Sequence, residues 1–272
     1  MNLPTRIAYM PNPRVQDYFR ALSDTVVRLS PYALSKTGLV SAQTILKIEN
    51  YMLICSPYEL SMRKAVLLLI LSRDETQFFQ QYKSSACALN LNFRKAGAEQ
   101  SRLFNVKSVL VQLGPVKGKQ NICMIEVSFT AYPPELIEIL GDFITGFNSL
   151  RGYYDTFQGR EIAIDAESAR ELRFNNFVEC YVGSKKVRAS LVNLSVNRLA
   201  LILPETAGEV AVGEVFPTKL YFQLYQFMVK GRVTATSQTQ DGLRVRYDIQ
   251  FAPELVEILD DYFYRVSHST AS

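Results

Sequence analysis

The chain of 272 residues contains one histidine, His268, and no tryptophan. His268 lies in a Ser- and Thr-rich C-terminal segment, where a general base would be poorly held. The sequence also lacks a Gly-x-Gly-x-x-Gly motif, a Gly-Lys-Ser/Thr phosphate loop and a Gly-x-Ser-x-Gly nucleophile motif. These absences argue against an enzyme, and we expect neither a cofactor nor a metal site.

Cysteine is also scarce, with only Cys55, Cys87, Cys123 and Cys180 and no Cys-x-x-Cys pair. Widely spaced thiols predict reduced, buried side chains and not disulfides or a zinc site. The N-terminus lacks the apolar segment of a secretory signal. The longest apolar run, residues 65–71, is far shorter than the roughly 20 residues that span a bilayer. We therefore expect a cytoplasmic protein without a membrane span.

Positive charge is concentrated in the first half of the chain. The net charge of +4 arises from 16 Lys/Arg against 11 Asp/Glu in residues 1–148, and 14 against 15 in residues 149–272. A basic half can face nucleic acid, anionic lipid or an acidic partner. Because the sequence has no dense Lys/Arg run, a solvated surface is the favoured interpretation.

An internal repeat dominates what the sequence does contain. Residues 134–143 return as residues 253–262 with only three of ten positions changed. A shorter repeat places Leu60-Ser61 and Leu194-Ser195 each a few residues before an apolar run. Such repeats predict a duplicated module. We therefore predict two related domains, residues 1–148 and 149–272.

Short alternating runs predict strands in both halves, and the repeated segments predict one amphipathic helix after each set. A mainly β fold follows: two tandem six-stranded β-barrels, each with a C-terminal α-helix. Residues 13–29 predict a further helix, and Gly146 and Gly152 predict a hinge between residues 143 and 157. The predicted strands are 43–49, 51–56, 65–72, 86–93, 105–113 and 121–130, then 176–183, 186–193, 198–204, 217–224, 227–236 and 243–251.

The segment Val192-Asn193-Leu194-Ser195-Val196-Asn197-Arg198 resembles the strand-to-strand turn of the PilZ domain. The resemblance covers residues 151–266, and the repeat extends it to a divergent N-terminal PilZ-like domain. It implies a six-stranded barrel with a C-terminal helix and cyclic-di-GMP as the ligand. The family signatures are an Arg-x-x-x-Arg and an Asp/Asn-x-Ser-x-x-Gly. Arginine pairs with guanine edges and phosphates, and Asn and Ser add directional hydrogen bonds.

The sequence departs from both signatures. Asn193 and Ser195 match, but Arg198 occupies the glycine position, and no Arg-x-x-x-Arg begins the second domain. Losing one charged guanidinium contact costs about 1.5–3 kcal/mol. The resemblance therefore implies nucleotide binding that is weakened or lost. The candidate ligand-binding residues are Arg160, Arg170, Arg173, Asn193, Ser195 and Arg198.

Each candidate also has a structural interpretation. Asn193 and Ser195 are common turn formers, and the arginines fit a solvated basic face. Arg198 fits a salt bridge to a neighbouring acid, and the aromatic residues 153, 154 and 157 fit interface packing.

We therefore predict a non-enzymatic PilZ-type signalling effector or adaptor with a protein partner. A true cyclic-di-GMP receptor is one alternative. A β-barrel protein that binds single-stranded nucleic acid is another alternative. It would use the aromatic and basic residues Tyr221, Phe222, Tyr225, Lys219 and Lys230.

Overall fold

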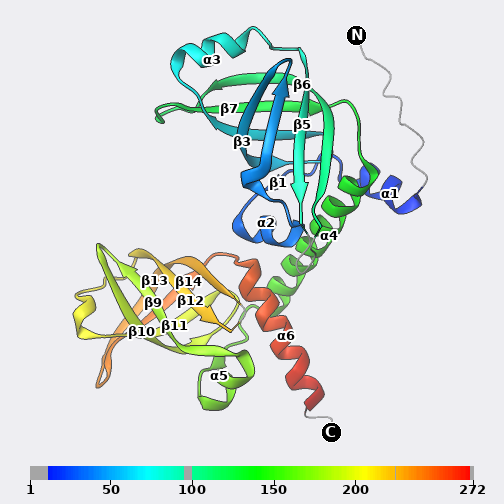
Figure 1. Cartoon of the computed structure of the whole chain (residues 1–272). Coiled ribbons are helices and arrows are strands. Elements are labelled where there is room, and N and C mark those ends of the chain that lie inside the picture. Colours follow the sequence, from blue (N-terminus) through cyan, green and yellow to red (C-terminus); the bar gives the residue numbers. More distant parts are fainter. Residues whose placement is uncertain (1–11, 95–99, 224, 270–272) are drawn as a thin grey trace. The chain divides into compact units, whose positions relative to one another are not determined.

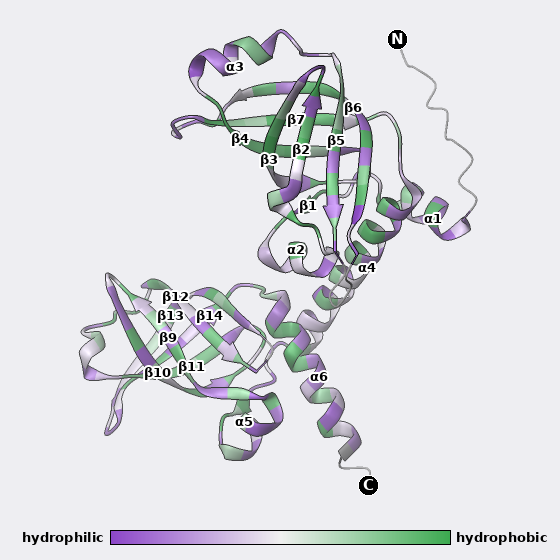
Figure 2. Cartoon of the chain, viewed as in Figure 1, coloured by the Kyte–Doolittle hydropathy of each residue, from purple (hydrophilic) through white to green (hydrophobic). Residues whose placement is uncertain are grey.

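Two closed antiparallel β-barrels form the chain (Figure 1). The computed structural model describes residues 12–94, 100–223 and 225–269, and the chain divides into two units, Met1–Gly146 and Phe147–Ser272. Hydrophobic and hydrophilic residues alternate along the strands (Figure 2), so one face of each strand points into its barrel. The predicted mainly β fold with two six-stranded barrels is confirmed.

The N-terminal barrel follows the strand order β3-β2-β5-β6-β7-β4, and pairing of β3 with β4 closes it. A short strand, β1 (Val27–Arg28), adds to the outside of β3. Helices α1 (Pro13–Leu22), α2 (Pro31–Thr37) and α3 (Arg73–Gln80) and the 3₁₀ turn η1 (Ser41–Gln43) complete the unit. The barrel strands are β2 (Thr44–Ile48), β3 (Tyr51–Leu60), β4 (Lys64–Ile70), β5 (Ala86–Phe93), β6 (Arg102–Pro115) and β7 (Ile122–Phe129).

The C-terminal barrel repeats this order as β10-β9-β12-β13-β14-β11, closed by pairing of β10 with β11. Here β8 (Ile162–Ala163) pairs with β10, and helix α5 (Ala166–Leu172) precedes the barrel in the chain. The 3₁₀ turn η2 (Glu205–Ala207) lies between β11 and β12. The barrel strands are β9 (Phe174–Val182), β10 (Lys185–Leu194), β11 (Arg198–Leu203), β12 (Val215–Phe222), β13 (Gln226–Thr239) and β14 (Gly242–Ile249).

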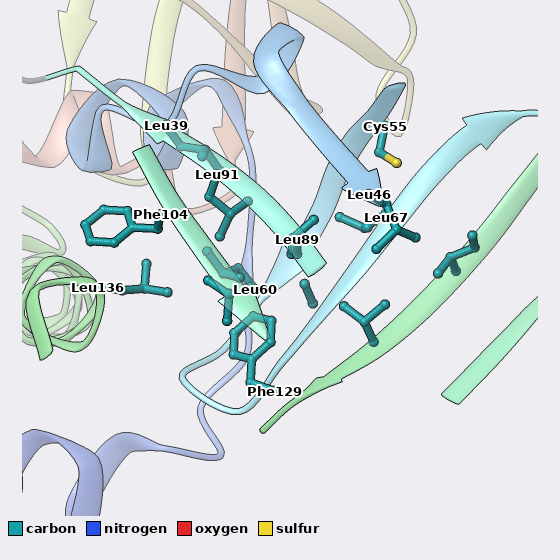
Figure 3. Packing of buried hydrophobic residues seen from close by; sticks show 14 of the residues in the cluster. Leu39, Leu46, Cys55, Leu60, Leu67, Leu89, Leu91, Phe104, Phe129 and Leu136 are labelled. Atoms are coloured by element: carbon teal, nitrogen blue, oxygen red, sulfur yellow. The ribbon is translucent and has the colours of Figure 1, made fainter. Parts of the chain in front are cut away.

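The repeated segments form the helices that follow each barrel, α4 (Pro134–Phe157) and α6 (Pro253–Ser269). Leu136 and Leu140 of α4 are buried, as are Leu255 and Leu259 of α6. Figure 3 shows Leu136 beside the inward-facing side chains of the N-terminal barrel, including Leu60 and Phe104. Burying each leucine contributes about 1.5–3 kcal/mol, so each helix is part of its barrel's core.

Helix α4 serves both units. Its first half packs on the N-terminal barrel. Its second half packs beside the start of α6 in the C-terminal unit, as α1 packs beside the start of α4 in the N-terminal unit. The ring of Phe19 on α1 lies 4.9 Å from that of Tyr132, and the ring of Tyr154 on α4 lies 5.3 Å from that of Phe251. Residues 143–157 were predicted as a hinge; they are helical, the boundary between the two units falls between Gly146 and Phe147, and the hinge stays a prediction.

The duplication extends further than the sequence shows. Before each barrel a two-residue strand leads into a seven-residue helix, β1 into α2 and β8 into α5. Gly38 ends α2 with a φ of 77°, and Arg173 ends α5 with a φ of 54°. The Gly38 carbonyl accepts a hydrogen bond from the residue after β5, and the Arg173 carbonyl accepts one from the residue after β12. Arg173 thus holds a left-handed position that favours glycine.

The predicted length of the first helix needs correction. The helix expected over residues 13–29 ends at Leu22, because the buried Ser23 caps it through a bond to the Phe19 carbonyl and the chain then turns into β1. Among the described residues, no helix combines the length and apolar character needed to cross a membrane.

Candidate functional site

The turn between β10 and β11 carries the predicted motif. The backbone N–H of Ser195 donates to the Arg198 carbonyl at 2.8 Å, and its Oγ lies 3.0 Å from Oδ1 of Asn197. Only 1% of Ser195 is exposed. The hydroxyl therefore holds the turn and is not presented to solvent.

The N-terminal barrel has the same turn between β3 and β4. Here the N–H of Ser61 donates to the Lys64 carbonyl at 2.8 Å, and Ser61 Oγ accepts from the N–H groups of Arg63 and Lys64 at 3.2 and 3.1 Å. A bulge precedes both turns, two residues before Leu60 in β3 and at the same place in β10. The serine is thus required by the turn in both barrels, as its structural interpretation expects.

Arg198, at the position of the family glycine, extends over the outside of the barrel. Its Nε donates to Asp248 of β14 at 2.8 Å, and its guanidinium also lies 3.5 Å from Glu161. The hydrogen bond to Asp248 is the main cause of a raised pKa of Arg198, so the group is cationic at all physiological pH. The expected salt bridge of Arg198 is confirmed.

Asn193 belongs to the same polar network. Its side-chain amide donates to the second carboxylate oxygen of Glu161 at 3.1 Å. Glu161 thereby joins Asn193 to Arg198 across β8, which pairs with β10 at this point. Two carboxylates and one guanidinium thus lie at the motif, and Asn193 and Arg198 both donate to these carboxylates.

The three remaining arginines lie on other elements. The guanidinium of Arg160 stacks over the rings of Phe157 and Phe263 at 5.4 and 5.6 Å. Arg170 on α5 is exposed and lies 3.9 Å from Glu171, and Arg173 follows that helix. Arg160 directly precedes Glu161, which bonds to the motif, but its own guanidinium lies against the two phenylalanine rings. The described residues do not join Arg170 or Arg173 to it by any hydrogen bond or ion pair.

Sequence reasoning missed Glu161 and Asp248. Asp248 is one of the polar residues that alternate with buried ones along β14, which was a usable signal for an outward-facing carboxylate. Glu161 had no such signal, because its contact with the motif depends on β8, a strand of two residues.

The alternative nucleic-acid surface is not a continuous stacking platform. Phe222 is only 5% exposed, and it stacks on Phe227 with ring centroids 5.9 Å apart. Tyr221 donates its hydroxyl to Glu179, which raises the pKa of Tyr221 to about 12. Phe222 was expected to stack on bases and instead lies inside the barrel, so that part of the alternative is wrong.

Residues 13–146 match the family model of the PilZN3 domain. This half of the chain is a PilZN3 domain. The match begins at α1 and ends within α4, so it covers the N-terminal barrel together with α1, α2, α3 and the first half of α4. The predicted PilZ family is thereby confirmed, and the two barrels confirm the tandem arrangement.

Three solved structures are similar to this PilZN3-containing chain, among others. The PlzA protein of Borreliella burgdorferi in complex with c-di-GMP is 15% identical, with a TM-score of 0.44, over 92% of this chain and 98% of that one. YcgR of Escherichia coli in complex with c-di-GMP is 14% identical, with a TM-score of 0.30, over 88% of each chain. The Bacillus subtilis inhibitor of motility is 10% identical, with a TM-score of 0.31, over 84% and 97%. No curated protein is significantly similar in sequence.

Proposed function

We propose that this chain is a non-enzymatic PilZ-type signalling effector or adaptor whose C-terminal barrel has weakened or lost cyclic-di-GMP binding. The observation that carries the proposal is the network of Arg198, Asp248 and Glu161 around the motif turn. A phosphate placed there would meet two carboxylates and compete with both for one guanidinium. At about 5 Å, each like-charge contact costs roughly 1–3 kcal/mol in a surface dielectric.

The missing arginine pair points the same way. Of the three other candidate arginines, Arg160 has its guanidinium against aromatic rings, and Arg170 is exposed beside Glu171 on α5. Without further guanidinium groups, a dianionic ligand loses about ten- to a hundred-fold in affinity per missing charged contact.

An exposed apolar strip on the N-terminal barrel supports the adaptor role. Met52 and Ile54 of β3 and Ile70 of β4 are 70%, 77% and 83% exposed. The two strands pair, and Met124 of the next strand, β7, is also exposed. Contiguous apolar side chains on a soluble surface mark protein interaction sites. A photo-crosslinking residue at position 54 should capture a partner that the same residue at the exposed Lys107 does not.

The nucleotide part is tested by calorimetry with cyclic-di-GMP on the full chain. We expect little or no binding by the unmodified protein, and tighter binding by Glu161→Gln/Asp248→Asn. Glu205→Gln/Glu209→Gln is the control and should leave binding unchanged, because these residues follow the end of β11 opposite to the turn, where Lys185 at the start of β10 bonds to Thr206. Arg198→Gly should weaken any residual binding, because it leaves both carboxylates uncompensated.

Submicromolar binding by the unmodified protein would refute the weakened site and establish the alternative, a true cyclic-di-GMP receptor. Tighter binding by Arg198→Gly would show instead that this side chain obstructs a working pocket.

A further inference from the structure

A cavity of about 570 Å³ lies within the C-terminal unit, away from the motif turn. It is bounded by the second half of α4, the end of α5, the segment between β12 and β13, and α6. Three tyrosines, Tyr153, Tyr225 and Tyr264, contribute to its wall together with the carboxylate of Asp260. Its volume is in the range of small-molecule sites.

The duplication explains why this cavity exists. In the N-terminal unit the ring of Tyr18 lies directly on Gly141: a Cβ at Gly141 would come within 2.1 Å of that ring. In the C-terminal unit the equivalent positions are Tyr153 on α4 and Asp260 on α6. Because Asp260 has a side chain, Tyr153 cannot lie against the helix as Tyr18 does. Tyr153 is 42% exposed, and its ring stacks on Phe157 at 6.0 Å.

Asp260 is a carboxylate of this wall that has no ion-pair partner among the described residues. Its neighbour Asp261 pairs with Arg265 at 3.1 Å, and Arg265 also pairs with Glu171 at 3.5 Å. Among the described residues, none donates a hydrogen bond to Asp260 or pairs with it. Burial, with the nearby Asp261 charge second, raises the pKa of Asp260 above its ordinary value. Burial therefore destabilises the ionised carboxylate, and no ion pair or hydrogen bond offsets this cost.

The remaining charges of the wall favour a cation modestly. Arg173 and Arg265 face three carboxylates, those of Glu257, Asp260 and Asp261. Since Arg265 is engaged by Asp261 and Glu171, Arg173 is the cation that opposes an incoming positive charge. A compact positive group that enters beside Asp260 gains an ion pair and aromatic faces together.

We propose that this cavity binds a guanidinium group, with Asp260 as the pairing carboxylate and the tyrosine rings as stacking partners. The planar guanidinium matches a carboxylate through two parallel N–H bonds, stacks on aromatic rings and is more weakly hydrated than an ammonium. An ammonium of the same charge gains only the ion pair and gives up a stronger hydration shell. The site does not depend on the proposed loss of nucleotide binding.

The guanidinium has two possible sources, a free small molecule and an arginine side chain of a protein. The experiment is a titration of the full ¹⁵N-labelled chain, followed by NMR shifts of residues around the cavity. The probes are propylguanidine, butylamine as its ammonium counterpart of similar length, and the blocked peptide acetyl-Gly-Arg-Gly-amide. We expect saturable shifts at millimolar concentration with propylguanidine and with the peptide, and at least several-fold weaker binding of butylamine. Tighter binding of the peptide would identify arginine in a protein as the source; tighter binding of propylguanidine would identify a free molecule.

Two variants test the assignment to Asp260. Asp260→Asn keeps the shape and removes the charge, so it should weaken propylguanidine binding about ten-fold or more. Asp260→Gly restores the residue found in the N-terminal unit, so Tyr153 should close over the helix and abolish binding. Asp155→Asn, an exposed carboxylate on α4 outside the cavity wall, is the matched control and should bind as the unmodified chain does.

The proposal is overturned if neither guanidinium probe shifts the cavity residues, or if Asp260→Asn binds propylguanidine as tightly as Asp155→Asn. Equal binding of butylamine would also overturn it, because the site would then recognise only a positive charge.

Discussion

Gly141 on α4 allows a close contact that a single methyl group should break. A Cβ at this position would lie 2.1 Å from Cδ2 and 2.4 Å from Cγ of Tyr18. Carbon atoms in contact normally lie about 3.5–4.0 Å apart, so Gly141→Ala forces the ring or the whole of α1 to move. Because Cγ is the first ring atom, rotation about the end of the side chain does not relieve the overlap.

The neighbourhood of Tyr18 resists that movement. Its hydroxyl donates to Asp142 at 2.8 Å and accepts from Arg14 at 3.0 Å, while Val15 and Phe19 of α1 are buried in the barrel core. Replacing glycine by alanine inside a helix is worth about 0.5–1 kcal/mol in propensity. Overpacking costs about 1–3 kcal/mol, and a lost hydrogen bond about 0.5–1.5 kcal/mol. We therefore expect Gly141→Ala to destabilise the N-terminal unit by about 1–3 kcal/mol.

Urea unfolding of the full chain, followed by circular dichroism and tyrosine fluorescence, measures this change. Gly152→Ala on the same helix is the control, because a Cβ there meets nothing within 4 Å; it should stabilise by about 0.5–1 kcal/mol. In a Tyr18→Ala background, Gly141→Ala should also stabilise, which gives a coupling energy of about 1.5–4 kcal/mol. A stabilising effect of Gly141→Ala while Tyr18 is present would refute the reasoning.

Three further outcomes follow from burial. Leu259→Ala should lower the free energy of unfolding by about 2–5 kcal/mol, because Leu259 is fully buried. Val266→Ala, on the exposed side of α6, is the control and should change it little. An unchanged thermal midpoint for Leu259→Ala would mean that α6 does not pack on its barrel. Asp260→Asn should raise the thermal midpoint at pH 7: the folded-state pKa of this carboxyl is raised, so its ionised form costs stability, and the gain should fade as the pH drops through that pKa toward the ordinary aspartate value. A gain that persists in acid would contradict that sign. Burial raises the pKa of the Cys55 thiol to about 12 and that of Cys180 to about 11, so neither should react with iodoacetamide at pH 8 until the chain unfolds, as peptide mass spectrometry can follow.

Strand periodicity made most of the fold predictable. The strands alternate between a buried and an exposed face, as in β7 and β14, and the proline-led helices α4 and α6 share seven of their first ten residues. Short helices were missed, although α3 begins with a readable capping box of Ser72 and Glu75. Helix α5 begins with Asp165 and Ser168 in the same roles. Both signals were available in the sequence, and periodicity over seven or eight residues was too weak to draw attention to them.

The longer duplication could not be found by comparing residues. Ser30-Pro31 begins α2 and Asp165-Ala166 begins α5, so the two helices share a capping geometry and no amino acid there. The polar network around the motif was equally hidden. Arg198 and Asp248 are brought together by the register of β11 and β14, and fifty positions separate them in the chain.

The duplicated turn shows which motif positions carry information about a ligand. Ser61 and Ser195 each donate their N–H and their hydroxyl to the carbonyl three residues later, although the N-terminal turn has Glu59 where the other has Asn193, and Lys64 where the other has Arg198. The serine therefore has a structural role in both turns, whether or not the barrel binds a ligand. Only the flanking positions, which the backbone does not require, can report nucleotide binding, and both Asn193 and Arg198 are engaged by Glu161. Glu161→Gln removes the charge of that carboxylate, so the affinity of this variant for cyclic-di-GMP is the informative measurement.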